Sequence, residues 1–470
     1  MSPDASSNRL RILHLGLGAF HRAHQAVYLH QLIQQGDTRW QLAGTNLRPD
    51  MADTLLALQR QGGAYTLETV SPSGQRHCDR ITSITEVIPH EPKLATAIAR
   101  AADPSTRIVS FTVTEAGYYL DDQHRLDLTH PDVAADLAGR SRQTIYGAAT
   151  AMLEARMRQQ AGGLTLLNCD NLRHNGDRFR DGLLQFIAAL QQPELLDWVH
   201  THTSCPNAMV DRITPRPAPE LKARIAQAMH WNDEVPVMAE DFIQWVIEDR
   251  FCNGRPAWET VGVQMVADVQ PYEEAKIRIL NASHSCIAWA GTLRGLSYIH
   301  EGTQDPVIRR MAHDYVTNDV IPCLHNPRQA SPVDLGAYRD TVLQRFGNRA
   351  IADTNQRVAA DGFAKIPGFI VPTIRERLAA GQGIASVARL PALFLAFLQR
   401  WHEGRLPYAY QDQAMNPERA HAICAAADPV QAFSTEPALW GELAGNEALH
   451  TALAAARREI ATFIDEGVLA

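Results

Sequence analysis

The sequence has no CxxC pair, no long hydrophobic run and no excess of basic residues. Its seven cysteines are dispersed and odd in number, which argues against a disulfide framework and favours reduced thiols. No stretch approaches the roughly 20 apolar residues that span a bilayer, and the polar start of the chain lacks a signal peptide's apolar core. A net charge of -8 offers no basic surface to nucleic acid. We therefore expect a cytoplasmic protein that binds neither nucleic acid nor membrane.

What the sequence does contain is typical of a globular protein. Its 470 residues are 45% hydrophobic and 20% charged, which is enough for two or three domains. Strand-like and helix-like segments alternate up to about residue 270, and helical periodicity dominates from there to the end. We therefore predict an α/β domain over residues 1–268 and a mostly α-helical domain over residues 269–470.

A glycine turn lies near the start of the chain. The apolar run at 11–15 ends in Gly16 and Gly18, and a helical pattern follows over 25–34. This order is typical of Rossmann-type domains, whose glycines let the backbone approach the pyrophosphate of a dinucleotide. His21 stands where the fingerprint has its third glycine. Because ordinary tight turns use the same residues, the motif alone leaves both interpretations open.

The ribose of NAD is usually held by an acid just past the second strand. We predict that strand at 40–44, and Asp50 follows it. The alternative is that Asp50 caps the next helix. A guanidinium such as that of Arg48 suits the phosphate of NADP, but the presence of the acid favours NAD.

Two further predicted strands carry polar side chains to the carboxyl edge of the sheet, where open α/β sheets bind ligands. The strand at 107–113 ends in Thr114 and Glu115, and the strand at 164–169 ends in Asp170 and Asn171. Asn171 is predicted to line the cofactor and substrate cleft, with an Asx-type turn as the alternative. Later strands of this domain are expected at 235–238 and 261–269.

The helix predicted at 272–289 has almost no polar face, yet it contains Lys276, Asn281 and His284. On an α-helix that turns roughly 100° per residue, His284 lies at ~80° and Asn281 at ~140° from Lys276. All three side chains then leave one side. A lysine among apolar neighbours favours its neutral amine, which is a base, and the other two groups can hold oxygens beside it. The alternative is a core helix whose lysine snorkels to water.

The helical half also carries Arg357 and Lys365, each near the end of a predicted helix. Cations there stabilise terminal carbonyls, or they donate hydrogen bonds to the hydroxyls of a polyol, and charge alone does not separate these interpretations. Further helices of this half are expected at 305–320, 335–346, 391–402 and 448–463.

Several motifs together resemble the polyol-specific long-chain dehydrogenases, the family that includes the mannitol dehydrogenases. They are Gly16-x-Gly-x-Phe-His-Arg-Ala-His24, Thr112-Val-Thr-Glu115, Cys169-Asp-Asn171, Asp211-Arg-Ile-Thr-Pro215, Lys276-x4-Asn281-x2-His284 and the stretch from Arg357 to Pro367. The resemblance covers essentially the whole chain. Its lysine, asparagine and histidine signature is fairly specific, whereas the glycine pair is not.

The resemblance implies metal-independent, NAD-linked oxidation of a polyol to a ketose. D-arabinitol and D-xylulose are the expected substrate and product, and D-mannitol is the alternative substrate. The family's general base falls on Lys276, its oxygen-binding amides on Asn171 and Asn281, and a substrate contact on His284. From another class, the same fold also serves as an NAD sensor without activity.

The resemblance also implies a Rossmann-type domain followed by a largely helical one, with the site in the cleft between them, and a monomer. Glu273 matches a glutamate on the lysine's proton route to solvent. The residues that match contacts to the sugar chain are Asp211, Arg357 and Lys365. The implied cofactor contacts are Gly16, Gly18, Phe20, His21, Arg22, Asp50, Thr114 and Glu115.

Overall fold

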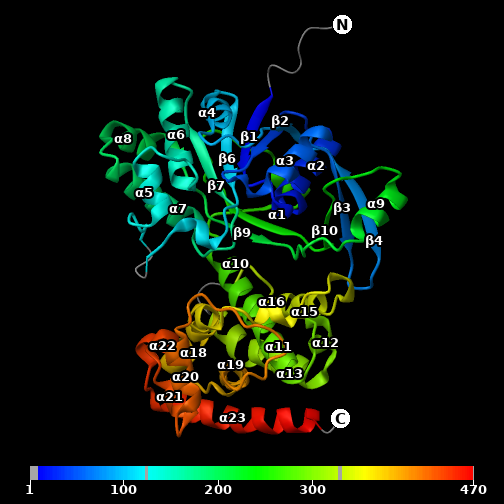
Figure 1. The fold of residues 1–470 in the computed structure, drawn as a ribbon, viewed down its shortest axis with the longest axis vertical. Helices are drawn as coiled ribbons and strands as arrows, with labels where there is room; N and C mark the ends of the chain where they lie inside the picture. Colours follow the sequence, from blue (N-terminus) through cyan, green and yellow to red (C-terminus); the bar gives the residue numbers. More distant parts are fainter. Residues whose placement is uncertain (1–8, 122–124, 326–330, 469–470) are drawn as a thin grey trace. The chain divides into compact units, whose positions relative to one another are not determined.

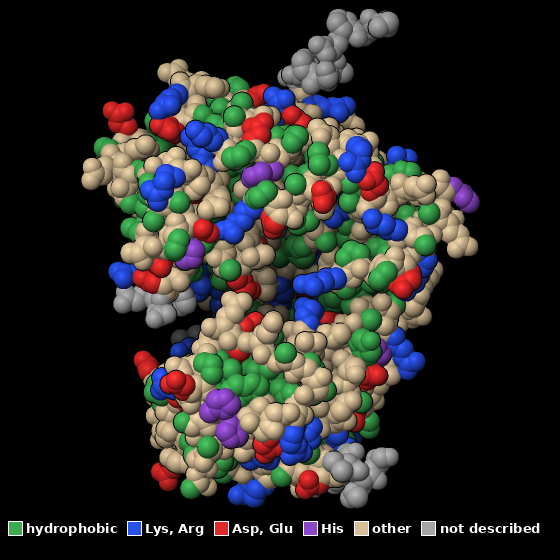
Figure 2. Space-filling view, viewed as in Figure 1, with side chains coloured by type: hydrophobic (Ala, Val, Ile, Leu, Met, Phe, Trp, Pro, Cys, Tyr) green, Lys and Arg blue, Asp and Glu red, His purple; other side chains and the backbone are tan. Residues whose placement is uncertain are grey.

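The computed structural model describes residues 9–121, 125–325 and 331–468. The chain divides into two compact units. The first runs to Gln270 without Pro72–Gly74, and the second consists of those three residues and Pro271–Ala470. Within the described ranges, no helix is both long and apolar enough to cross a membrane. Acidic and basic side chains are interspersed on the face drawn in Figure 2.

A six-stranded parallel sheet organises the first unit (Figure 1). In spatial order its strands are β5 (Ile84–Val87), β2 (Trp40–Thr45), β1 (Leu10–Leu15), β6 (Thr106–Phe111), β7 (Leu164–Asn168) and β8 (Thr203–Ser204). The order along the chain reverses between β1 and β6, which is where doubly wound sheets bind dinucleotides. The predicted Rossmann-type fold is therefore confirmed.

Alternate residues of β1 are buried on opposite faces of this sheet, as the period of a strand requires. Leu13 and Leu15 belong to one core, with α4 (Ala95–Ala102), α6 (Ile145–Arg158) and α7 (Asn175–Ala189). Ile12 belongs to the other core, with α2 (Gln25–Gln34). The remaining helices of the unit are α1 (Ala19–Ala23), α3 (Ala52–Arg60), α5 (Pro131–Leu137), α8 (Pro193–His202) and α9 (Leu221–Met229).

Two three-stranded sheets complete the first unit. One consists of β10 (Val237–Glu240), β3 (Tyr65–Val70) and β4 (Arg76–Ile81), and the other of β12 (Gln264–Val266), β11 (Gln244–Glu248) and β9 (Ala208–Asp211). The strand expected at 261–269 was therefore predicted too long. Its start belongs to a 3-10 turn (Trp258–Val261), because Gly262 adopts φ +96° and ends the turn before the strand can begin.

In its described residues, the second unit is built from helices. A continuous helical stretch contains α10 (Gln270–Ala275), a π-helical segment η4 (Lys276–Asn281) and α11 (Ala282–Leu293). The other α-helices are α12 (Ile299–Gln304), α13 (Pro306–Tyr315), α14 (Ile321–Leu324), α15 (Leu335–Phe346), α16 (Asn355–Ala359), α17 (Gly362–Lys365), α18 (Val371–Ala379), α19 (Ala385–His402), α20 (Pro417–Ala425), α21 (Pro429–Ser434), α22 (Pro437–Trp440) and α23 (Glu447–Val468).

The helix expected at 391–402 begins six residues earlier, at Ala385, and Pro391 lies inside it. The prediction treated this proline as the first helical residue, the position that Pro306, Pro417 and Pro429 do occupy. Pro391 is instead accommodated within α19, whose central residues are almost completely buried. Packing of this apolar face outweighs the local cost of the proline.

Candidate active site

The glycine turn after β1 is specified by close packing. Gly16 has φ +113°, and a β-carbon on it would lie 2.3 Å from the carbonyl oxygen of Thr112. Its amide donates to the carbonyl of Thr45 at 2.8 Å, which joins the turn to the end of β2. Gly18 has an ordinary φ of -74°, and the nearest atom to an added β-carbon is 4.0 Å away. Only Gly16 is therefore required by the fold itself.

His14 supports this turn from beneath. Its Nε2 lies 3.1 Å from the carbonyl oxygen of Gly16, and its Nδ1 lies 2.8 Å from the hydroxyl oxygen of Ser110. Because a carbonyl only accepts, Nε2 carries the hydrogen and Nδ1 accepts from Ser110. Burial lowers the pKa of His14 to about 3, so the ring is neutral at physiological pH. The ring of His21 stacks on it with centroids 3.4 Å apart.

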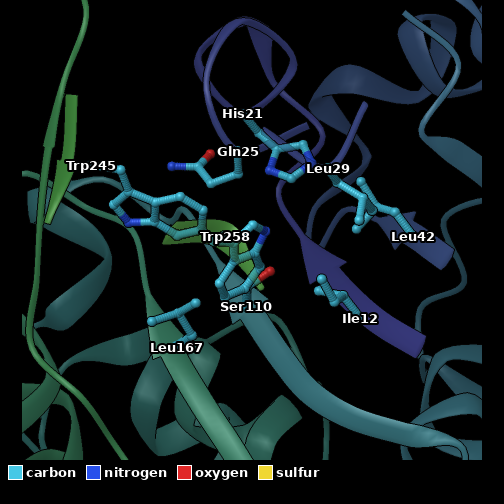
Figure 3. A pocket seen from close by; sticks show the side chains of 9 residues that line it. All are labelled: Ile12, His21, Gln25, Leu29, Leu42, Ser110, Leu167, Trp245 and Trp258. Carbon is cyan, nitrogen blue, oxygen red and sulfur yellow. The ribbon is translucent and has the colours of Figure 1, made fainter. Parts of the chain in front are cut away.

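The side chains of His21 and Arg22 point into the core. His21 and Gln25 line a small cavity with Trp245 and Trp258 (Figure 3). The Arg22 guanidinium donates to the carbonyl of Val235. These side chains are thus engaged inside the fold, and any cofactor contact at the two positions falls to their backbone. Phe20 is partly buried against the ring of His24.

The segment after β2 presents Asp50 to solvent, in a 3-10 turn (Pro49–Met51). Met51 occupies the cap position of α3, so the alternative role of Asp50 as a helix cap is not found. Arg48 is paired: its NH2 group donates to the phenol of Tyr119 at 2.6 Å and to Asp132 at 2.5 Å. The Asp50 carboxylate is therefore exposed, and the neighbouring Arg48 guanidinium already pairs with Asp132.

The loops after β6 and β7 are tied together by Asp170. Its carboxylate accepts from the amides of Val113 and Thr114 at 3.0 and 2.9 Å and from the Tyr118 hydroxyl at 2.6 Å. Burial raises the pKa of Asp170, while these hydrogen bonds oppose the rise. Thr114 is held at φ +65°, a conformation that non-glycine residues rarely adopt.

The polar residues expected at this edge are all found at the carboxyl ends of neighbouring strands. Thr114 and Glu115 follow β6 and are exposed, and Asn171 follows β7 and is also exposed. With the turn after β1, they lie on adjacent strands at the point where the strand order reverses. Asp211 ends β9 in the same unit and is 5% exposed.

In the second unit, Lys276 and Asn281 are the first and last residues of the π-helical segment. The α-helical angles used for the prediction do not apply there, because π-helical hydrogen bonds run from residue i to i+5 and widen the turn. Asn281 therefore lies about one turn from Lys276, on the same face. Lys276 is 6% exposed and Glu273, three residues before it, is 4% exposed. Single π turns are frequent at functional sites.

His284 lies one turn further, packed on Phe346 with ring centroids 4.3 Å apart. Its Nε2 is 3.3 Å from a carboxylate oxygen of Asp353, but the two groups are not aligned as a hydrogen bond. Burial lowers the pKa of His284, and Asp353 opposes the shift. Burial would raise the pKa of Asp353, but its contacts with His284 and Arg357 hold it well below its ordinary value.

The two predicted cations lie near this group. Arg357 donates to Asp353 at 2.6 Å, and its side chain is 64% exposed. Lys365 donates to the carbonyl of Val358 at 2.7 Å, and its charge also lowers the pKa of His284. Asp353 was not predicted as a site residue, although its spacing of four from Arg357 is a helical pairing signal. Asp170 was not predicted as a site residue either, whereas its neighbour Asn171 was.

Within the described residues, no group of three or more histidine, cysteine, aspartate or glutamate side chains is placed to hold a metal ion. The first unit thus contains the glycine turn, an exposed acid and an amide side chain. The second contains a buried lysine with an amide one π turn away and a neutral imidazole. These are the groups that a nucleotide-linked alcohol oxidation requires.

Two family models match the chain over nearly its whole length. The mannitol dehydrogenase Rossmann domain matches residues 10–260, and the mannitol dehydrogenase C-terminal domain matches residues 268–461. D-arabinitol 4-dehydrogenase of Ralstonia nicotianae is 57% identical over 452 residues, covering 96% of each chain. D-arabinitol 4-dehydrogenase of Klebsiella pneumoniae is 53% identical, covering 94% of this chain and 96% of that protein.

A solved structure of similar architecture is that of Pseudomonas fluorescens mannitol 2-dehydrogenase in a ternary complex with NAD and D-mannitol. It has a TM-score of 0.84 and 34% sequence identity, and the match covers 98% of this chain and 94% of that chain. A substrate-free D-sorbitol dehydrogenase matches with a TM-score of 0.87 and 30% identity, over 98% of this chain and 97% of its own.

Proposed function

The chain belongs to the mannitol dehydrogenase family, and on that premise we propose that it oxidises D-arabinitol to D-xylulose with NAD. The observation that carries the proposal is its identity of 57% and 53%, along almost its whole length, to two D-arabinitol 4-dehydrogenases. A nearly complete match of this kind includes both the nucleotide-binding and the helical unit, so it bears on the substrate as well as the fold.

The residues of the first unit fit a dinucleotide. The turn from Gly16 to Gly18 leaves open space beside Gly18, and Asp50 is an exposed acid past β2. We assign cofactor contacts to these residues, to Thr114 and Glu115, and to the backbone at residues 20–22. When bound, NAD supplies the hydride acceptor. The chain's own part is to hold the nucleotide at this edge of the sheet.

We assign the proton transfer to Lys276. Its burial favours a neutral amine, which takes the proton of the substrate hydroxyl at C4. Asn281, one π turn away, donates to that oxygen as negative charge develops, and Asn171 is assigned the same role. Glu273 is assigned the relay that returns the proton to water. We assign contacts with the hydroxyls of the polyol to Arg357, Lys365, Asp211 and the neutral ring of His284.

NADH formation on mixing the protein with NAD and D-arabinitol tests the proposal directly. A panel of D-arabinitol, D-mannitol, sorbitol, xylitol and ribitol then ranks the substrates by kcat/KM. D-mannitol is the second candidate, because the mannitol 2-dehydrogenase complex shares this architecture over nearly the whole chain. NAD binding without NADH formation from any polyol would instead identify a sensor.

Replacing Lys276 tests the base. Lys276→Ala is expected to lower oxidation by at least about a hundredfold, the usual contribution of a positioned base. In the wild type, oxidation should fall as the pH drops because the amine becomes protonated, while ketose reduction should persist. The variant should lose that pH dependence.

Lys93→Ala, at an exposed lysine of the first unit, is the control and should keep the wild-type rate and pH profile. Near-normal turnover with an unchanged profile in Lys276→Ala would remove the lysine from this role.

We also propose that the protein is a cytoplasmic monomer. All seven cysteines are free thiols, as expected in a reducing compartment. Light scattering of the purified protein and fractionation of cells measure the two properties directly.

A further inference from the structure

Arg48, Tyr119 and Asp132 form a closed cluster in the first unit, and we call it the arginine lock. Arg48 donates to the phenol oxygen of Tyr119 at 2.6 Å and to the carboxylate of Asp132 at 2.5 Å. The Tyr119 hydroxyl donates to the same carboxylate at 3.0 Å. Arg48 and Asp132 are 84 positions apart in the sequence, so the fold, not local chain geometry, creates the contact.

The lock joins three segments of the nucleotide-binding edge. Arg48 follows β2 and stands two residues before Asp50. Tyr119 ends the 3-10 turn Glu115–Tyr118, which begins directly after Thr114, and Asp132 lies in the first turn of α5. Asp132 is fixed further by Gln143, whose amide donates to its other oxygen at 3.2 Å. Burial raises the pKa of Tyr119 to about 12, so the phenol keeps its hydrogen and continues to donate.

An arginine just past the second strand is the side chain that accepts the additional phosphate of NADP in folds of this kind. In this chain Asp132 already neutralises that arginine. We propose that Asp132 sets the preference for NAD over NADP by holding Arg48 in the lock. The inference rests on the proposed NAD-linked function and deepens it, because it names the residue that excludes the phosphorylated cofactor.

Two features make the lock effective. The Arg48 side chain is 47% exposed, so once released it can turn toward a phosphate in solvent. While the lock is closed, a phosphate approaching Arg48 also meets the negative charge of Asp132, whose side chain is 28% exposed. NADP must therefore break a charge-assisted pair and overcome a like charge, whereas NAD requires neither.

The test is to release Arg48 and measure both cofactors. Asp132→Ala is expected to raise the ratio of NADP to NAD affinity by about tenfold, the size of one ordinary hydrogen bond to a charged group. Affinity is measured by titration of the protein with each nucleotide in the absence of polyol. The gain should shrink as salt is added, since it comes from a partly exposed charge. Asp132→Ala combined with Arg48→Gln should return the ratio to the wild-type value.

A matched control exists at the other end of the same strand. Arg39 is exposed and pairs with Asp37 at 2.8 Å, at the amino end of β2. Asp37→Ala changes the net charge by the same amount and frees an arginine far from the nucleotide-binding edge, so the ratio should stay unchanged. An equal gain in Asp37→Ala, or no gain in a folded Asp132→Ala, overturns the proposal.

Two further measurements separate a failure of this proposal from a folding defect and from a failure of the proposed function. Should Asp132→Ala not fold by circular dichroism, Asp132→Asn removes the charge at constant size and decides the question. Nucleotide titration also separates this inference from the proposed function. A wild type that binds NAD but forms no NADH from any polyol would remove the function and leave the lock to be tested by affinity alone.

Discussion

Gly16 and Gly18 occupy the same turn for different physical reasons. Gly16 adopts φ +113° and has a carbonyl oxygen 2.3 Å from the place of a β-carbon. Gly18 adopts an ordinary backbone conformation with open space around it. The fold therefore demands the first glycine, whereas the second leaves space that a pyrophosphate can approach.

This difference predicts opposite behaviour of two alanine variants. Gly16→Ala should destabilise the protein by a few kcal/mol, about 2 or more, because φ and a backbone clash both oppose it. Gly18→Ala should fold with nearly wild-type stability and bind NAD at least about tenfold more weakly. Urea denaturation and NAD titration of both variants measure this. Equal stability of the two variants would show that the turn relaxes around Gly16.

At the scale of elements, Asp170 joins β6 to β7. Three donors converge on its carboxylate, and they include the amide of Thr114 in its rare conformation. Asp170→Ala leaves the buried Tyr118 hydroxyl and the two partly buried amides unpaired, and should lower the free energy of unfolding by about 3 kcal/mol. NAD binding should weaken as well, because the loop after β6 loses its shape.

A graded series makes that prediction specific. Asp170→Asn should cost less, because its carbonyl oxygen still accepts from both amides, and Tyr118→Phe should cost about 1 kcal/mol for the loss of one donor. The order is measured by urea denaturation followed by tryptophan fluorescence. If Asp170→Ala were as stable as Tyr118→Phe, water would be replacing the carboxylate as the acceptor.

How far the sequence predicts each element depends on how local its cause is. The strand at 40–44, the helix at 25–34 and the helix at 335–346 were predicted to within one residue. Their apolar periodicity and the residues that begin and end them are all local features of the sequence. The edge strand β5 was not predicted, since four residues provide little periodicity. The π turn at Lys276 could not be predicted either. It packs against other π-helical segments, η5 (Val316–Val320) and η7 (Ile366–Ile370), which lie far along the chain, and no local pattern encodes such contacts.

The same division holds for the site. Lys276, Asn281 and His284 share one helical stretch, so their spacing marked them as candidates and the family resemblance then gave them roles. Asp170 contacts Val113 across 57 positions and Arg48 contacts Asp132 across 84, and no local pattern marks such partners. The residues to which we assign the chemistry were thus marked by a local pattern, whereas Asp170 and Asp132, which hold the loops at this edge of the sheet, became apparent only in the fold.

At the scale of the whole molecule, both units bury neutral histidines. Burial lowers the pKa of His14 and His21 in the first unit and of His284 in the second. In the unfolded chain each of these rings takes a proton near pH 6.5. The unfolded state therefore binds more protons as the pH falls below this value, and the folded state loses stability.

The expected loss can be measured ring by ring. Between pH 7 and 5, His14 alone should lower the free energy of unfolding by about 2 kcal/mol, because its folded pKa near 3 keeps it neutral throughout. His14→Gln should be less stable at pH 7 but show a shallower decline toward pH 5. His77→Gln, at a ring 72% exposed, should decline in parallel with the wild type. Asp353 adds nothing in this window, because a carboxylate with a lowered pKa loses its contribution only below about pH 4. A decline in His14→Gln as steep as in the wild type would mean that His14 gains its proton in the folded state.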